Sequence, residues 1–239
     1  DLRGQLLADR VLHPGSLRDT PIRAVLLTNG DIDHIAGLLT LREKQTFRLL
    51  ATADIHAVLD ANPIFTALDA ELVVREVIAL NTPFALTDGL QAELFAVPGK
   101  VPLFLEGEQV DTELEGEQTV AVEICQDDHR LIYAPGCARL NHALRARLEG
   151  ADAVFFDGTL YRDDEMITAG LGHKTGKRMG HMSIDGADGS LALLRNIPIG
   201  RRIYIHINNS NPIWRDGPER RTVESAGFEI GFDGMEIEL

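Results

Sequence analysis

The chain contains short apolar segments that each stop at a polar or glycine-rich turn, and this pattern limits the fold more than any other feature. Residues 24–28 (AVLLT) run into Asn29-Gly30-Asp31, and similar segments occupy 93–97, 130–134, 153–156 and 202–207. Short runs rich in Val, Ile and Phe are typical of buried strands. Helical patterns lie at 34–44, 52–60, 141–150 and 186–197, and hairpins are predicted at 120–134 and in the tail, 227–239.

Strands that alternate with helices predict an α/β fold, and the hairpins predict a mixed sheet rather than a doubly wound parallel one. A chain of 239 residues can bury one large core, and no repeat or linker divides it. We therefore expect a single domain over residues 1–239.

Charge and cysteine content exclude several classes of protein. The formal charge of −14 argues against a nucleic-acid partner, because phosphate binding needs a basic surface. Only Cys125 and Cys137 occur, which excludes a disulfide framework and favours a reducing, cytoplasmic setting. No apolar run reaches the roughly 18 residues of a membrane span, so no membrane association is expected.

Three polar clusters follow predicted strands, where α/β proteins commonly build their sites. They comprise Asn29, Asp31, Asp33 and His34; then Asp157-Gly158-Thr159 with Arg178 to His181; and His206 with Asn208 to Asn211.

The first cluster has two interpretations. Carboxylates and a neutral imidazole on one turn, with a distant histidine such as His206, suit a divalent metal ion. Alternatively, Asp33 caps the following helix and Asp31 is a solvated turn residue. His206 itself could equally be a buried core histidine bonded to a carbonyl group.

The other clusters are also open to two readings. His181 could be a general acid or base, an anion contact near Lys174, Lys177 and Arg178, or a loop histidine. Asp157 could act in the site or only bond the backbone of its own turn. Cys137 is expected to be a small buried side chain rather than a reactive thiol.

The segment Asn29-x-Asp31-x-Asp33-His34 resembles the HxHxDH signature of the metallo-β-lactamase fold. Pro98-Gly99-Lys100, residues 133–137 and His206 stand where that family has its later motifs. A closer resemblance is to the coenzyme PQQ synthesis protein B family, carried by TNGDIDHIAGLLTLRE, VPGKVP, YAPGCAR, FDGT, TGKRMGH and HINNSNP. The resemblance implies an αββα sandwich of mixed sheets flanked by helices. It also implies that the family's opening strands and cysteine-rich structural zinc segment lie outside this sequence.

Departures from the lactamase pattern change the expected chemistry. Asn29, Asp31 and Lys100 stand where hydrolytic members use histidines, and the bridging aspartate falls near Gly136. Asp33, His34 and His206 are retained, and Asp31 is expected either as a fourth, oxygen ligand or as a side chain that supports the ligands. Two histidines and a carboxylate are typical of a non-haem Fe(II) site rather than a dizinc hydrolase. The resemblance implies one Fe(II) ion, with Zn(II) as the ion to be expected after isolation.

The resemblance further implies hydroxylation, dependent on iron and O2, of the tyrosine ring of the Glu–Tyr-derived precursor of PQQ. Asp157 and His181 would then orient ligands or move protons, and Lys100, Arg178 and Asn208 are the candidate substrate contacts. Other enzymes of the pathway are candidate partners, and a homodimer stays open. The alternatives are a non-catalytic carrier for PQQ transport or export, and a metal-dependent hydrolase.

Overall fold

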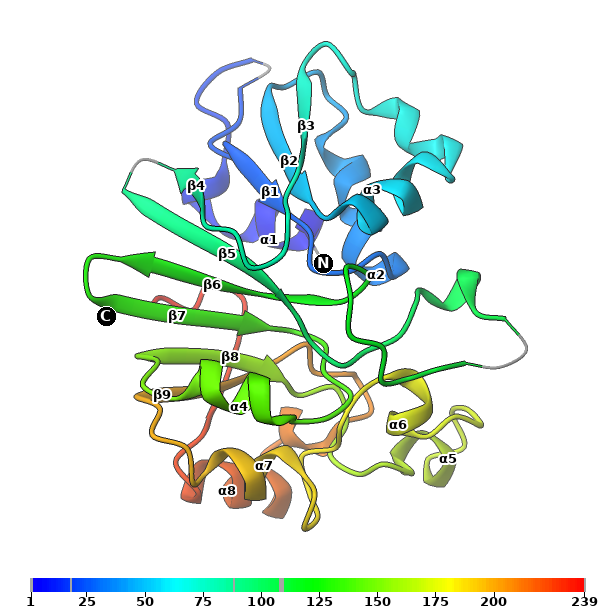
Figure 1. Cartoon of the computed structure of the whole chain (residues 1–239), viewed down its shortest axis with the longest axis vertical. Coiled ribbons are helices and arrows are strands. Elements are labelled where there is room, and N and C mark those ends of the chain that lie inside the picture. Colours follow the sequence, from blue (N-terminus) through cyan, green and yellow to red (C-terminus); the bar gives the residue numbers. More distant parts are fainter. Residues whose placement is uncertain (1, 18, 88, 108–109, 239) are drawn as a thin grey trace.

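The computed structural model describes residues 2–17, 19–87, 89–107 and 110–238, and two sheets lie within these ranges. The smaller sheet is parallel, and its strands are β1 (Ala24–Leu26), β2 (Phe47–Ala51) and β3 (Val73–Val77). The larger sheet has the strand order β10-β9-β8-β7-β6-β5-β4 (Figure 1). Its strands are β4 (Phe84–Thr87), β5 (Leu90–Ala96), β6 (Val120–Gln126), β7 (His129–Ala134), β8 (Ala153–Asp157), β9 (Arg201–Ile205) and β10 (Glu229–Ile230).

The larger sheet is mixed, as the sequence predicted. Strands β4 to β7 pair antiparallel, whereas β7, β8, β9 and β10 pair parallel. Ala134 is in register with Phe156, and Asp157 with Ile205, so β7, β8 and β9 end at the same edge. The turns that follow these strands therefore meet at one place, which is where the later polar clusters lie.

Both faces of the larger sheet are buried. Side chains alternate between the two faces of a strand, and in β5 Leu94 belongs to one hydrophobic cluster while Phe95 belongs to the other. In β6, Val120 and Ala121 divide in the same way. One cluster packs the sheet against the smaller sheet and its helices, and the other packs it against the helices of the C-terminal half.

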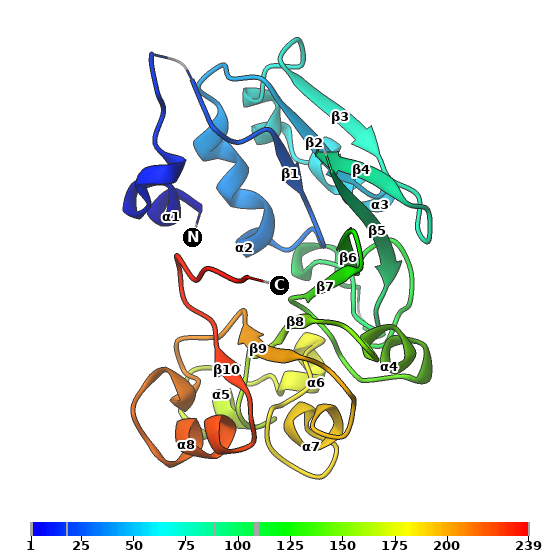
Figure 2. The ribbon, with the colours of Figure 1, turned by 90° about the vertical axis from the view of Figure 1, so that its left-hand side faces the viewer.

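The helices cover the two sheets on their outer sides. Helices α7 and α8 lie at the opposite end of the molecule from β1–β3 (Figure 2). The α-helices are α1 (Leu2–Ala8), α2 (Ile32–Ile35), α3 (Ala53–Asp60), α4 (His142–Leu148), α5 (Glu165–Thr168), α6 (Gly176–Met179), α7 (Ser190–Leu194) and α8 (Pro218–Ser225). The 3-10 helices are η1 (Arg10–Leu12), η2 (Ala36–Leu41), η3 (Pro63–Ala67), η4 (Leu103–Leu105) and η5 (Pro212–Trp214).

Two predicted elements differ from the structure. The expected helix at 34–44 begins earlier, as α2, and continues as the 3-10 helix η2. The tail prediction at 227–239 was wrong, because β10 is the one strand there among the residues described and 231–238 form no second strand. Gly234 does make a turn, with φ of +83°, but a turn without a partner strand does not make a hairpin. The hairpin at 120–134 is confirmed, with Asp127 at φ +51° in its turn.

Candidate metal centre

Asp33 and His34 lie in the first turn of α2, directly after the turn that leaves β1. Asn29 holds this turn, because its side-chain oxygen accepts a hydrogen bond of 2.9 Å from the N–H of Asp31. The carbonyl of Asp31 then accepts from the N–H of His34 over 2.9 Å, which closes the first helical turn. Helix α2 begins at Ile32, so Asp33 and His34 are consecutive residues in its first turn.

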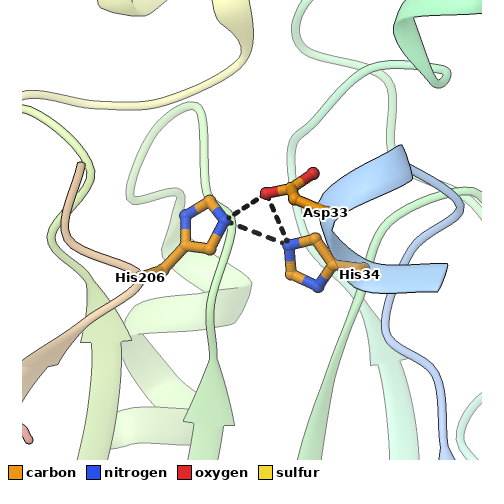
Figure 3. A group of neighbouring side chains, drawn as sticks. All are labelled: Asp33, His34 and His206. Atoms are coloured by element: carbon orange, nitrogen blue, oxygen red, sulfur yellow. Dashed lines mark hydrogen bonds and ion pairs between the residues drawn. The ribbon is translucent and has the colours of Figure 1, made fainter. Parts of the chain in front are cut away.

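His206 reaches the same point from the other side of the molecule. It follows β9 directly and has φ of +53°, in the left-handed region that residues other than glycine rarely adopt. The His206 Nε2 atom lies 3.0 Å from Asp33 Oδ2 and 3.1 Å from His34 Nε2, and the latter two atoms are 3.8 Å apart (Figure 3). A backbone conformation of this kind at a site residue is typical of a functional constraint.

These three side chains fit a divalent metal ion. Nitrogen and carboxylate oxygen ligands lie about 2.0–2.2 Å from zinc, so ligands at right-angled or tetrahedral positions are roughly 3–3.5 Å from one another. The three observed separations of 3.0, 3.1 and 3.8 Å are close to this range. Asp33, His34 and His206 therefore form a triangle of donor atoms that one ion can bridge.

The pKa values of the three groups are interdependent. Hydrogen bonding to His206 outweighs burial and lowers the pKa of Asp33 well below its usual range. Burial and the charge of His206 lower the pKa of His34 to about 4, so His34 is neutral at pH 7. Burial opposes protonation of His206, but the hydrogen bond to Asp33 and the nearby Asp157 carboxylate raise the pKa of His206 overall. The centre thus combines the ionised carboxylate of Asp33 with the neutral imidazole of His34, whose Nε2 atom lies 3.1 Å from His206 Nε2.

Asp157 is fully buried behind this triangle and is saturated with hydrogen bonds. Its Oδ2 accepts from the backbone N–H of Cys137 over 2.9 Å and from His181 Nδ1 over 2.7 Å. Its Oδ1 accepts from both the N–H and the hydroxyl of Thr159, over 3.0 and 2.6 Å. Burial raises the pKa of Asp157, but the neighbouring His181 outweighs it and the net shift is downward. Asp157 is thus an anionic anchor that bonds its own turn and also holds His181.

Thr159 is a site residue that the sequence analysis did not assign a role. Its Oγ1 atom lies 2.7 Å from His206 Nδ1, and the side chain is buried. His181 stacks on His206 with 5.3 Å between ring centroids, and its Nε2 has no hydrogen bond to any residue that the structure describes. The only sequence signal for Thr159 was its place in the Asp-Gly-Thr turn after β8.

Asp31 lies beside the triangle of ligands but not within it. Its Oδ1 accepts a hydrogen bond of 3.1 Å from the N–H of Leu103 and lies 3.8 Å from Lys100 Nζ. The structure thus aims the carboxylate of Asp31 at η4 and Lys100. Asp31 is thus the partner of a neighbouring ammonium group in this structure, and its binding to a metal ion stays a prediction.

Lys100 belongs to a cluster of charges that centres on Glu106. The Glu106 side chain is 7% exposed and accepts from Arg178 Nη2 over 2.8 Å, with Lys100 Nζ at 3.2 Å and Lys174 Nζ at 3.4 Å. The hydrogen bond from Arg178 and the two lysines lower the pKa of Glu106 to about 2. Three cations surround this one carboxylate, so the cluster keeps a positive charge beside the ligand triangle. Lys177 makes no contact with Glu106 in the part of the chain that the structure describes.

Asn208 and Cys137 have structural contacts. Asn208 donates to Ser210 Oγ over 3.1 Å and accepts from the N–H of Asn209 over 2.9 Å, so it organises its own loop. Cys137 is fully buried, and burial raises the pKa of its thiol strongly, as expected for a packing residue.

Comparison with known proteins identifies the family. A family model described as a beta-lactamase superfamily domain matches residues 1–207. Coenzyme PQQ synthesis protein B from Rhizobium meliloti (strain 1021) is 56% identical over 239 residues, which cover 100% of this chain and 79% of that protein. The protein of the same name from Ruegeria pomeroyi is 55% identical, with coverage of 100% and 81%. The chain belongs to the coenzyme PQQ synthesis protein B family.

A solved structure supports this assignment to the coenzyme PQQ synthesis protein B (PqqB) family. The crystal structure of Zn(2+)-bound PqqB from Methylobacterium extorquens superimposes with a TM-score of 0.96 at 50% identity, and the match covers 99% of this chain and 80% of that one. The fold is the metallo-β-lactamase fold, with mixed sheets flanked by helices, as predicted. No helix among the described residues of this PqqB family member is long and apolar enough to cross a membrane.

Proposed function

We propose that this member of the PqqB family acts in PQQ biosynthesis as an iron(II)- and dioxygen-dependent hydroxylase of the tyrosine ring in the Glu–Tyr-derived precursor. The observation that carries the proposal is the convergence of Asp33, His34 and His206 on one point. Two imidazoles and one carboxylate with open positions are typical of non-haem iron oxygenases. A bound ferrous ion would supply the activation of dioxygen.

The surroundings of the triangle favour a single ion. Lys100, 9% exposed, stands where the resemblance places a metal-binding histidine of hydrolytic relatives, and its ammonium group faces Asp31. An ammonium group that is paired with Glu106 and Asp31 has no lone pair to offer a second metal ion, whereas a dimetal hydrolase needs ligands for two ions. Asp31, the neighbouring acidic side chain, is already engaged by Leu103.

The cationic cluster suits a substrate that has several carboxylates. Arg178 can grip a carboxylate through two parallel hydrogen bonds, and Lys100 offers a compact positive charge. The Arg178 side chain is 39% exposed, so its charge can meet an incoming carboxylate, although its Nη1 atom is buried and has no hydrogen-bond partner among the described residues. Glu106 holds these cations together while neutralising only part of their charge.

His181 is the side chain best placed to exchange a proton with substrate. Its Nδ1 donates to Asp157 over 2.7 Å, so the Nε2 atom is the one left for exchange. His181 also stacks on His206, with 5.3 Å between the ring centroids, which supports a role beside the ligand triangle. We assign His181 the role of general acid or base, with Asp157 as the group that orients it.

One reconstitution experiment tests the proposal. The metal-free chain is loaded with Fe(II) under anaerobic conditions, and the Glu–Tyr-derived precursor and oxygen are then added while oxygen uptake and product mass are measured. We expect oxygen consumption coupled to a product that gains the mass of oxygen. Turnover of an ester or phosphodiester with zinc, and none with iron, would show a hydrolase instead. Tight binding of PQQ without either activity would show a carrier.

A further inference from the structure

The hydroxyl group of Thr159 joins the ligand triangle to the buried anchor Asp157. Its Oγ1 lies 2.6 Å from Asp157 Oδ1 on one side and 2.7 Å from His206 Nδ1 on the other. Thr159 is 7% exposed, so water does not compete freely for either bond. His206 thus has one ring nitrogen facing Thr159 and the other facing Asp33 and His34.

The chemistry of these groups fixes where the protons lie. A hydroxyl has one hydrogen to donate, and the ionised carboxylate of Asp157 can only accept, so Thr159 donates to Asp157. The oxygen of Thr159 then offers a lone pair to His206, which must donate from Nδ1. His181 does not change this pattern, because its Nδ1 is nearer to Asp157 Oδ2, at 2.7 Å, than to Thr159 Oγ1, at 3.2 Å.

We propose that Thr159 is a positioning residue for the metal centre, and that it acts by keeping the proton of His206 on Nδ1. A metal ion can then replace the proton that Nε2 donates to Asp33, so that Nε2 binds the ion through its lone pair. This inference rests on the ligand set of the proposed function. It assigns Thr159 no contact with substrate or with the ion.

The bond to Thr159 adds to the contacts that orient the ring of His206. The backbone there has φ of +53°, and the ring also stacks on His181 with 5.3 Å between the centroids. The bond to Thr159 holds the ring from the side opposite to the ligands. Outer partners of this kind commonly contribute about 10- to 100-fold in metal affinity.

The test compares Thr159→Val with Thr159→Ser in the full chain. Valine keeps the shape but removes the hydroxyl, whereas serine keeps the hydroxyl. We expect Thr159→Val to weaken zinc affinity, measured by competition with a chelator, by about 10- to 100-fold, and we expect Thr159→Ser to stay near the unmodified chain. Long-range ¹H–¹⁵N spectra of the zinc-loaded protein should show the proton of His206 on Nδ1 in the unmodified and serine forms.

Two further variants make the outcomes distinguishable. Thr119→Val is the matched control, because Thr119 is also 7% exposed and bonds a backbone carbonyl rather than a histidine, and it should keep the zinc affinity. His206→Ala tests the ligand set itself. If His206→Ala keeps full affinity, the proposed metal centre is wrong. If His206→Ala weakens zinc affinity but Thr159→Val does not, the role given to Thr159 is wrong. The role is also wrong if Thr159→Val and Thr159→Ser weaken zinc affinity equally.

Discussion

The individual acidic side chains of the centre differ in what already occupies their oxygens. Asp33 points an oxygen at two imidazoles, whereas Asp31, two positions earlier, points one at the N–H of Leu103. Both oxygens of Asp157 accept hydrogen bonds, from the N–H of Cys137 and from the hydroxyl of Thr159. Chemical identity alone therefore does not decide which carboxylate binds an ion, because the direction and occupancy of its oxygens decide it.

This difference gives a paired prediction for Asp31 and Asp33. Asp33→Asn removes the charge that faces the histidines, and we expect zinc or iron content after dialysis against a weak chelator to fall severely. Asp31→Asn keeps an oxygen to accept from Leu103, and we expect the metal content to stay near that of the unmodified chain. Equal metal loss in both variants would instead make Asp31 a ligand.

The histidine ligands give a second prediction. We expect His34→Ala and His206→Ala each to weaken metal affinity by more than the 10- to 100-fold typical of an outer partner, because each removes a direct donor. His142→Ala, in an exposed histidine at the start of α4, is the control and should keep full affinity. Elemental analysis together with chelator competition measures the change. Unchanged metal content in both ligand variants would refute the ligand set.

Secondary structure near the site depends on a few capping side chains. Thr52 precedes α3, and its hydroxyl oxygen accepts from the N–H of Ile55 while its hydroxyl hydrogen goes to the carbonyl of Glu117 over 2.6 Å. The side chain is fully buried. It therefore fixes the start of the helix and also joins α3 to the segment that leads into β6.

We expect Thr52→Ala to lower the free energy of unfolding by about 1–2 kcal/mol, the upper part of the usual range for a lost N-cap, because the partly buried carbonyl of Glu117 also loses its donor. Thr52→Ser should recover most of the loss. Urea denaturation followed by circular dichroism measures both. A loss in the serine variant as large as in the alanine variant would mean that methyl packing, not capping, stabilises this helix.

Across the chain as a whole, Glu106 connects segments that are far apart in sequence. It follows η4 and bonds Arg178 in α6, with Lys174 and Lys100 beside it. Its carboxyl pKa falls from 4.5 in its ordinary state to about 2 in the fold. A carboxyl with a lowered folded-state pKa stabilises the protein above its unfolded pKa, and this contribution is lost as the pH falls toward the folded value.

Glu106→Gln should therefore destabilise the protein most at pH 6 and progressively less between about pH 4.5 and 2. Denaturant unfolding at several pH values measures the difference in the free energy of unfolding between the unmodified chain and Glu106→Gln. The other carboxyl groups are the same in both forms, so this difference reports Glu106 alone. A difference that stays constant over this range would mean that the charge of Glu106 does not stabilise the fold.

The features that could be predicted from the sequence are those determined by residues close together in the chain. Buried strands such as β8 are apolar runs between turns, and Asp33 and His34 are adjacent in the chain. The pairing of His206 with them needed the family motif order, since 172 residues separate it from His34.

Other features depend on contacts that no local pattern reveals. Thr159 and Glu106 were missed, because a threonine or a glutamate in a loop has no spacing that marks its partner. The predicted hairpin in the tail failed for the related reason that Gly234 marks a turn but cannot supply the strand to pair with.

The division of the ligand triangle between two packing units has a consequence for how the protein holds together. Ile35, next to His34, is buried in the cluster with the smaller sheet, while Tyr204, two residues before His206, is buried in the other cluster. An ion bound to all three side chains would act as a cross-link between these units, because their separation would break its coordination. Mass action then adds about 2.7 kcal/mol to folding when the free ion is at 100 times its dissociation constant. The resistance of the native protein to heat and proteolysis would thus report how much metal the cell supplies.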